Sequence, residues 1–194
     1  MLFRSLIDFA DNDVDPDLVI ALREIGPVTT GDIVKAANND LSPSFVSGMA
    51  QILHGIVMPG IAITGSPVRQ LIELNENDVS TDFVEELVRG GFTNLTIKQI
   101  IKLQENDVEP GDAAWFRQNL SAQITLEDVV RLANNDVGVD YVEPLLQFHL
   151  PDLTVDTLIQ LYEHDVSAED VEQAIEAFGD GLTAADLIDM ADNR

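Results

Sequence analysis

The sequence predicts an all-α fold, an α-solenoid of six two-helix repeats followed by a C-terminal half-repeat. The first observation is a recurring signature, in which asparagine or histidine precedes aspartate, and valine or leucine follows it. The aspartates of this signature are Asp13, Asp40, Asp78, Asp107, Asp136 and Asp165, separated by 27, 38, 29, 29 and 29 residues. A near-constant period of this length is typical of repeat proteins. The second observation is that apolar residues recur at helical spacing within each period.

Aligning the signatures divides the chain into units, and we expect residues 1–194 to form a single helical-repeat domain. The units begin near Leu2, Thr29, Pro67, Thr96, Thr125, Thr154 and Thr183. The second unit is longer than the others by about nine residues, and the surplus falls in residues 58–66. Insertions of this kind map to loops on one face of a solenoid.

Each unit is expected to open with a short helix. Thr125 with Asp128, and Thr183 with Asp186, have the spacing of a capping box, with aspartate in place of the usual glutamate. The helix is expected to end at Asn106 and its counterparts, because asparagine tolerates the left-handed conformation that often ends a helix.

A second short helix is expected directly after each signature. Proline follows a polar residue at Asp15, Ser42 and Glu109, as at an N-cap followed by the first helical turn. The valine or leucine of the signature is expected to fill the elbow between the helices, which we expect to meet at right angles. Neither helix is long enough to be stable alone, so neighbouring units must bury their apolar faces against one another.

The charge balance limits the classes of partner. The chain has 194 residues, with ten Lys and Arg against 35 Asp and Glu, a formal net charge of −25. Direct binding to nucleic acid or to an anionic membrane is disfavoured, because phosphate contacts need a basic footprint. The acidity indicates either a well-solvated surface, such as high salt would favour, or attraction of a basic partner.

Composition also bears on the setting of the protein. There is no cysteine, so disulfides and thiolate metal sites are excluded. No apolar run is long enough to span a membrane, and the acidic start of the chain is unlike a signal peptide. We therefore expect a cytoplasmic location, for a whole protein or for a domain of a longer one.

The segment from Gly91 to Val108 resembles a known tandem repeat. It is similar to the L-[ST]-x-x-x-L-I-x-L-R-D-H-G-V-[ST]-P repeats that accompany bacterial beta-lactam-sensor-type metallopeptidases and occur in other bacterial proteins. The resemblance implies a helical-pair repeat of about 29 residues and a bacterial source. It implies no catalytic residue, because the peptidase motif H-E-x-x-H is absent from this chain. The glycine of the family pattern is aspartate here in every full unit.

The six signature aspartates are candidate interaction residues. If the units stack, their carboxylates form a ladder that can attract a basic peptide or divalent cations. The alternative is that each carboxylate accepts backbone N–H groups at the turn and caps the following helix.

Two other segments are candidates. Asp11, Asp13, Asp15 and Asp17 alternate as in the opening of a calcium loop, but the required glycine is absent, so they are weak metal candidates only. We predict no resident metal or cofactor. In the insertion, Met58, Ile61 and Ile63 form either an apolar interaction patch or an addition to the core.

The sequence contains no constellation typical of catalysis, so we do not expect an enzyme. The favoured function is that of a non-catalytic acidic repeat protein, acting as a protein–protein interaction or scaffold module. One alternative is a nucleic-acid mimic that occupies the basic groove of a DNA-binding protein. Another is a structural protein that self-associates end to end into filaments.

Overall fold

The computed structural model describes residues 8–53, 66–93, 95–121, 123–179 and 181–193. The chain divides into two compact units, residues 1–105 and residues 106–194. The boundary falls inside the fourth predicted repeat, between its first and second helices. That 1–194 form a single domain therefore stays a prediction, and the two units are described separately.

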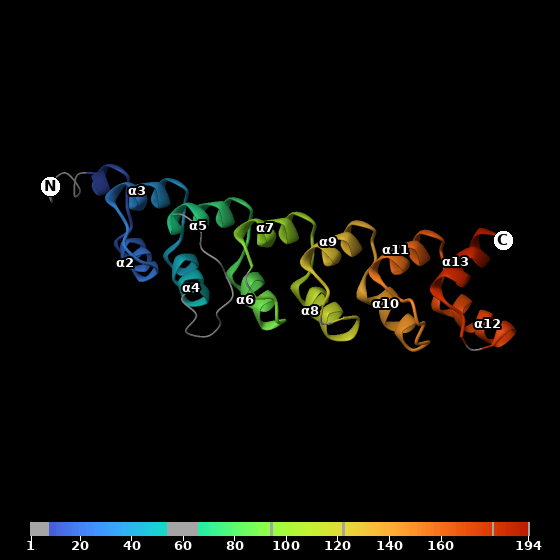
Figure 1. The fold of residues 1–194 in the computed structure, drawn as a ribbon. Coiled ribbons are helices and arrows are strands. Elements are labelled where there is room, and N and C mark those ends of the chain that lie inside the picture. Colours follow the sequence, from blue (N-terminus) through green and yellow to red (C-terminus); the bar gives the residue numbers. More distant parts are fainter. Residues whose placement is uncertain (1–7, 54–65, 94, 122, 180, 194) are drawn as a thin grey trace. The chain divides into compact units, whose positions relative to one another are not determined.

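Unit 1 contains three first helices and three second helices of the repeats, after a short helical stretch at residues 8–11. The helices are α2 (Pro16–Ile25), α3 (Thr30–Asn38), α4 (Pro43–Leu53), α5 (Pro67–Glu76), α6 (Thr81–Arg89) and α7 (Ile97–Glu105). Second helices pack on second helices, α2 on α4 and α4 on α6, while α3 packs on α5 and α5 on α7. These two rows are visible in Figure 1.

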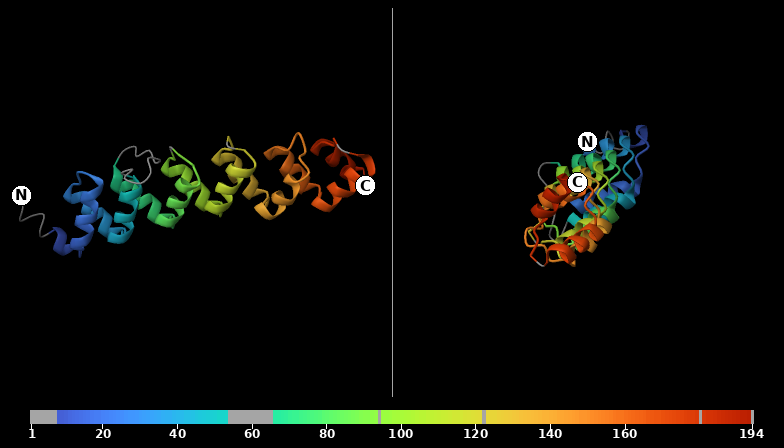
Figure 2. Two further views of the ribbon diagram at one scale, coloured as in Figure 1. Left: turned by 90° about the horizontal axis from the view of Figure 1, so that it is seen from below. Right: turned by 90° about the vertical axis from the view of Figure 1, so that its right-hand side faces the viewer.

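Unit 2 repeats this arrangement. Its helices are α8 (Pro110–Asn119), α9 (Leu126–Asn134), α10 (Val139–Leu146), α11 (Val155–Glu163), α12 (Ala168–Phe178) and α13 (Ala184–Asp192). The second helices α8, α10 and α12 pack in series, and so do the first helices α9, α11 and α13. The left view of Figure 2 shows the helix pairs of this unit following one another, seen from below.

The predicted fold class is confirmed: the protein is an all-α solenoid in which consecutive helix pairs pack on one another. The right-angled crossing of the paired helices stays a prediction. The insertion candidates Met58, Ile61 and Ile63 lie outside the described residues.

The core is built from the same repeat positions in each unit. On the first helices α3 to α13, the buried column consists of Ile33, Leu71, Ile100, Val129, Leu158 and Leu187. The valine or leucine that follows the signature aspartate was also predicted to be buried, in the elbow between the two helices. Five of these side chains are at most 5% exposed: Leu41, Val79, Val108, Val137 and Val166. Val14 is only half-buried. Because each unit contributes one side chain to each column, burial in one repeat depends on the repeat beside it.

The predicted capping boxes are present. The hydroxyl of Thr125 accepts from the backbone N–H of Asp128 (3.2 Å), and the Asp128 carboxylate accepts from the backbone N–H of Thr125 (3.0 Å). Thr183 and Asp186 make the same reciprocal pair. Hydrogen bonding of this kind holds the pKa of Asp128 and of Asp186 below its ordinary value. Where they occur, the caps fix the start of the first helix and so the register of the repeat; α5 has no side-chain cap at Ser66.

Two helical glycines provide a test of the packing between second helices in unit 1. A Cβ atom added to Gly48, in α4, would lie 2.7 Å from the methyl carbon Cγ2 of Thr81 at the start of α6. A Cβ added to Gly111, in α8, would meet no atom within 4 Å.

We therefore expect Gly48→Ala to lower the free energy of unfolding by about 1–3 kcal/mol, as overpacking does. Gly111→Ala should raise it by about 0.5–1 kcal/mol, because alanine is the better helix former. Chemical denaturation of both variants measures the two effects. Shifts of the same sign in both variants would contradict the close approach of α4 and α6.

Candidate functional site

The candidate site is the turn between the first and second helix of each repeat. The signature aspartate adopts a left-handed backbone conformation in all six turns, with φ between 47° and 56°. The asparagine before it does not: Asn77 and Asn135 have φ values of −105° and −110°. The prediction that the first helix ends at the asparagine is confirmed at Asn39, Asn77, Asn135 and Asn193, and at His164 in the sixth repeat. The left-handed conformation given as its reason was wrong, because the aspartate that follows adopts it.

The third repeat shows how the turn is held. The backbone N–H of Asp78 donates to the carbonyl of Asn75 (3.1 Å), and that of Val79 donates to the carbonyl of Leu74 (3.0 Å). These are the two hydrogen bonds of a Schellman motif, which satisfies the last carbonyls of a helix. The side-chain amide of Asn77 donates a further hydrogen bond to the carbonyl of Glu73, at 2.7 Å.

The same pattern recurs along the chain. The N–H of Val137 donates to Leu132 (3.0 Å) and that of Val166 to Leu161 (2.9 Å). The side-chain amide of Asn135 donates to the carbonyl of Arg131 at 2.8 Å. His164 ends α11 in place of asparagine, and its Nδ1 lies 2.8 Å from a carboxylate oxygen of Asp192 on α13.

The carboxylates of the six aspartates take no part in these hydrogen bonds of the turn. All six residues are exposed, and across the described ranges their side chains make no hydrogen bond or ion pair. Of the two alternatives for these carboxylates, capping of the following helix is not found among the described residues. That role falls two residues later, to Asp15, Ser80 and Ser167, whose side-chain oxygens accept from backbone N–H groups at 2.8–3.2 Å.

Aspartate is a costly residue for this position on two grounds. A left-handed conformation costs a residue with a Cβ roughly 1 kcal/mol or more, and glycine avoids that cost. A negative charge near the C-terminus of a helix also opposes the helix dipole, by about 0.3–1 kcal/mol. In the part of the chain that the structure describes, no contact of the carboxylate offsets either effect.

We predict a graded response at Asp78. Asp78→Gly should raise the free energy of unfolding by about 1 kcal/mol, and Asp78→Asn should raise it less, because asparagine tolerates the left-handed conformation and removes the charge. Asp78→Val should lower it, since a β-branched residue is strained there. Thermal unfolding of the three variants measures the order, and a stabilised Asp78→Val would contradict the assigned backbone conformation.

The weak calcium candidates do not converge. Asp15 caps α2 by accepting from the backbone N–H of Asp17 at 2.8 Å, so its carboxylate is engaged locally. Asp11, Asp13 and Asp17 are exposed. Among the residues that the structure describes, no group of three His, Cys, Asp or Glu side chains is placed to hold a metal ion.

Sequence reasoning missed two carboxylates with defined surroundings in unit 2. Asp152 accepts from the backbone N–H groups of Ala184 (2.6 Å) and Ala185 (3.2 Å), and so caps α13 from a loop 32 residues earlier. Asp112 is half-buried on α8, where burial, with Glu109 and Asp140 nearby, raises its pKa. Neither is visible in the repeat signature, because both lie at positions where the repeats differ.

The opposite pKa shifts of Asp112 and Asp186 predict opposite pH dependences. A raised pKa in the folded state means that the ionised Asp112 costs stability, and the cost appears as pH rises through its folded pKa. Asp112→Asn should therefore gain stability relative to the wild type between pH 3 and pH 7. The lowered pKa of Asp186 means that its ionised form stabilises the fold, so Asp186→Asn should lose stability over the same range.

Denaturation midpoints of the two variants across this pH range measure both trends. Parallel pH profiles for the two variants would contradict the surroundings assigned to these carboxyl groups.

Comparison with known proteins adds no further guide. No family model, no curated protein and no solved structure matches the chain. No helix of the described part is long and apolar enough to cross a bilayer. The cytoplasmic location, the bacterial source, the absence of enzymatic activity and the resemblance to sensor-associated repeats stay predictions.

Proposed function

We propose that this protein is a non-catalytic, acidic helical-repeat module that binds a basic surface of a partner protein through its six signature aspartates. The observation that carries the proposal is the state of these side chains. Each is exposed and lacks a partner among the described residues, and its backbone adopts a left-handed conformation. Strained positions with no local benefit are a reason to look for function.

The turn fixes the backbone from which each carboxylate side chain extends. In the third repeat, the hydrogen bonds of Asp78, Val79 and Asn77 fix the backbone on both sides of the aspartate. A rigid backbone lowers the entropic cost of ordering the side chain when a lysine or arginine approaches. Because the turn recurs in every full repeat, a partner with several basic residues can engage more than one carboxylate.

Such binding should depend strongly on salt. An exposed ion pair contributes only about 0.2–1 kcal/mol, and salt screens it. Useful affinity therefore needs several pairs at once, which a repeated acidic turn offers. The excess of 35 acidic over ten basic residues adds a long-range attraction that speeds encounter with a basic partner.

Two matched baits test the proposal. One carries Asp→Gly at all six signature positions, which keeps the turns intact. The other carries Glu→Gln at six exposed sites and loses the same charge; these sites are Glu24, Glu76, Glu105, Glu143, Glu163 and Glu176. Crosslinking capture from an extract of the source organism at low salt then compares both with the wild type.

We expect a basic protein that the wild type and the glutamate bait retain, that the aspartate bait loses, and that elutes as salt is raised. A partner that both baits retain equally would show that the aspartates are not the contact. The absence of any partner and of self-association would contradict an interaction module altogether.

A further inference from the structure

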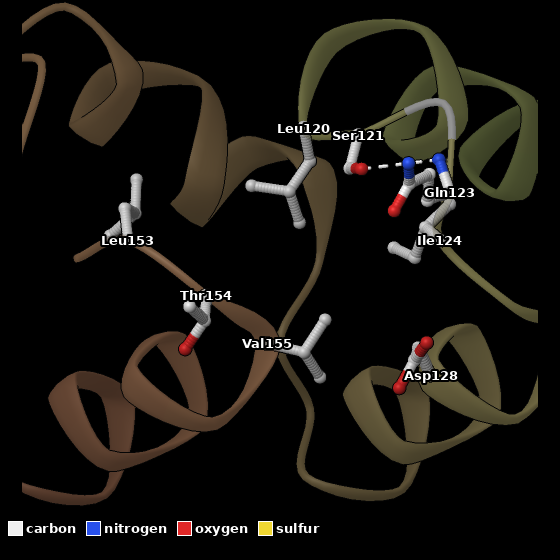
Figure 3. A pocket seen from close by; sticks show the side chains of 8 residues that line it. All are labelled: Leu120, Ser121, Gln123, Ile124, Asp128, Leu153, Thr154 and Val155. Atoms are coloured by element: carbon white, nitrogen blue, oxygen red, sulfur yellow. Dashed lines mark hydrogen bonds between the residues drawn. The ribbon is translucent and has the colours of Figure 1, made fainter. Parts of the chain in front are cut away.

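An open groove lies in unit 2, between the loop that follows α8 and the start of α11. Its volume is about 390 Å³. The residues that matter here are Leu120, Ser121, Ile124, Asp128, Leu153 and Val155. Figure 3 shows the side chains of Leu120, Ile124 and Val155 around the same space. Ile124 is buried, and Leu120, Leu153 and Val155 are half-buried, so one part of the wall is apolar. The other lining residues, Ser121, Gln123, Asp128 and Thr154, are polar.

At the position of Ser121, the third and fifth repeats place a large apolar side chain, while the first and sixth repeats have Pro27 and Gly179. The backbone N–H of Ser121 donates to the carbonyl of Phe116 (3.2 Å), five residues back. The N–H of Phe92 donates in the same way to Leu87 (3.2 Å). The two residues therefore occupy the same position after their second helices. Phe92 is 4% exposed, and Leu150, the counterpart in the fifth repeat, is 7% exposed. Ser121 is small and exposed.

Asp128 lines the groove, and the guanidinium of Arg131 pairs with it (3.8 Å) and with Asp156, so these three side chains carry one net negative charge. The Asp128 carboxylate accepts from the hydroxyl of Thr125 (2.6 Å) and from its backbone N–H (3.0 Å), which hold the pKa of Asp128 below its ordinary value. Asp128 is therefore ionised at neutral pH. Between Asn106 and Arg194 the chain has 20 acidic residues and three arginines. A ligand with acidic residues beside the inserted group would be repelled, and a basic one attracted.

We propose that this groove is a docking site for one large apolar side chain, of the size of leucine or phenylalanine, presented by a partner peptide with lysine or arginine on either side. The inserted side chain takes the place that Phe92 and Leu150 fill in their own repeats. The basic neighbours face Asp128 and the acidic surface around it. This surface is separate from the aspartate turns, so the inference does not rest on the proposed function.

Capped tripeptides serve as probes of the full chain by NMR of its methyl groups. Lys-Phe-Lys should shift the methyl signals of Leu120, Ile124 and Val155 in a saturable way. Lys-Ala-Lys lacks the large side chain, and Glu-Phe-Glu has the wrong charge; each should bind at least about tenfold more weakly, since one lost contact of this kind is worth about that factor. Equal binding of all three peptides, or no shift up to the solubility limit of Lys-Phe-Lys, would overturn the proposal.

Two variants at one position separate docking from general attraction. Ser121→Leu copies the residue of the fifth repeat and should fill the groove, which raises the melting temperature and abolishes the shifts caused by Lys-Phe-Lys. Ser121→Ala leaves the groove open and should bind within about twofold of the wild type, well under one tenfold step in affinity. If Ser121→Leu binds Lys-Phe-Lys as the wild type does, or melts at a lower temperature, the groove is not a space that a large apolar side chain fills.

Discussion

The structure depends on one hydrogen-bonded turn, in which the signature valine or leucine donates its backbone N–H to the first helix that precedes it, as Val14, Leu41, Val79, Val137 and Val166 do. In the third repeat this bond joins Val79 to Leu74 and places both side chains in the core. It ends the first helix, sets the direction of the second and buries the elbow side chain. Because short helices are unstable alone, this linkage lets each helix pair present one apolar surface to the next pair.

The turn also explains why exposed carboxylates recur at regular spacing and why each of them lowers the stability of the fold. A left-handed position must follow each first helix, and glycine would satisfy it with the least strain. The chain uses aspartate in all six places, so each repeat exposes a carboxylate beside the negative end of a helix. Proteins in general retain such strain where it serves binding or regulation. That is why the proposed function rests on these residues rather than on the acidic composition alone.

Much of the architecture follows from the sequence, because the features that set it are local. The period, the capping boxes at Thr125 and Thr183 and the placement of a valine directly after each turn each depend on residues close together in the chain. The assignment of the left-handed residue was wrong for a local reason too. Asparagine and aspartate both tolerate that conformation, and propensity alone does not say which of two neighbours adopts it. The structure shows which neighbour takes each position. The side-chain amide of asparagine can donate to the carbonyl four residues back, whereas a carboxylate has no hydrogen to donate, so the aspartate falls at the left-handed position.

The groove could not be predicted from the signature, because it arises from a difference between repeats. A column comparison of Phe92, Ser121 and Leu150 contains the signal, but only the fold shows that the large members of this column are buried. The cap that Asp152 provides for α13 is similar: its partners lie 32 residues away in the sequence. Positions that are alike in all repeats build the solenoid, and positions that differ between repeats give each repeat its own surface.

The most direct test of this account is the backbone conformation of the six signature aspartates in solution. A residue with positive φ brings its amide hydrogen close to its own Hα, so it gives a strong intraresidue NOE. We predict a strong NOE at each of Asp13, Asp40, Asp78, Asp107, Asp136 and Asp165, and a weak one at the preceding Asn77 and Asn135. Weak intraresidue NOEs at the aspartates would contradict the turn on which both the fold and the proposed binding surface depend.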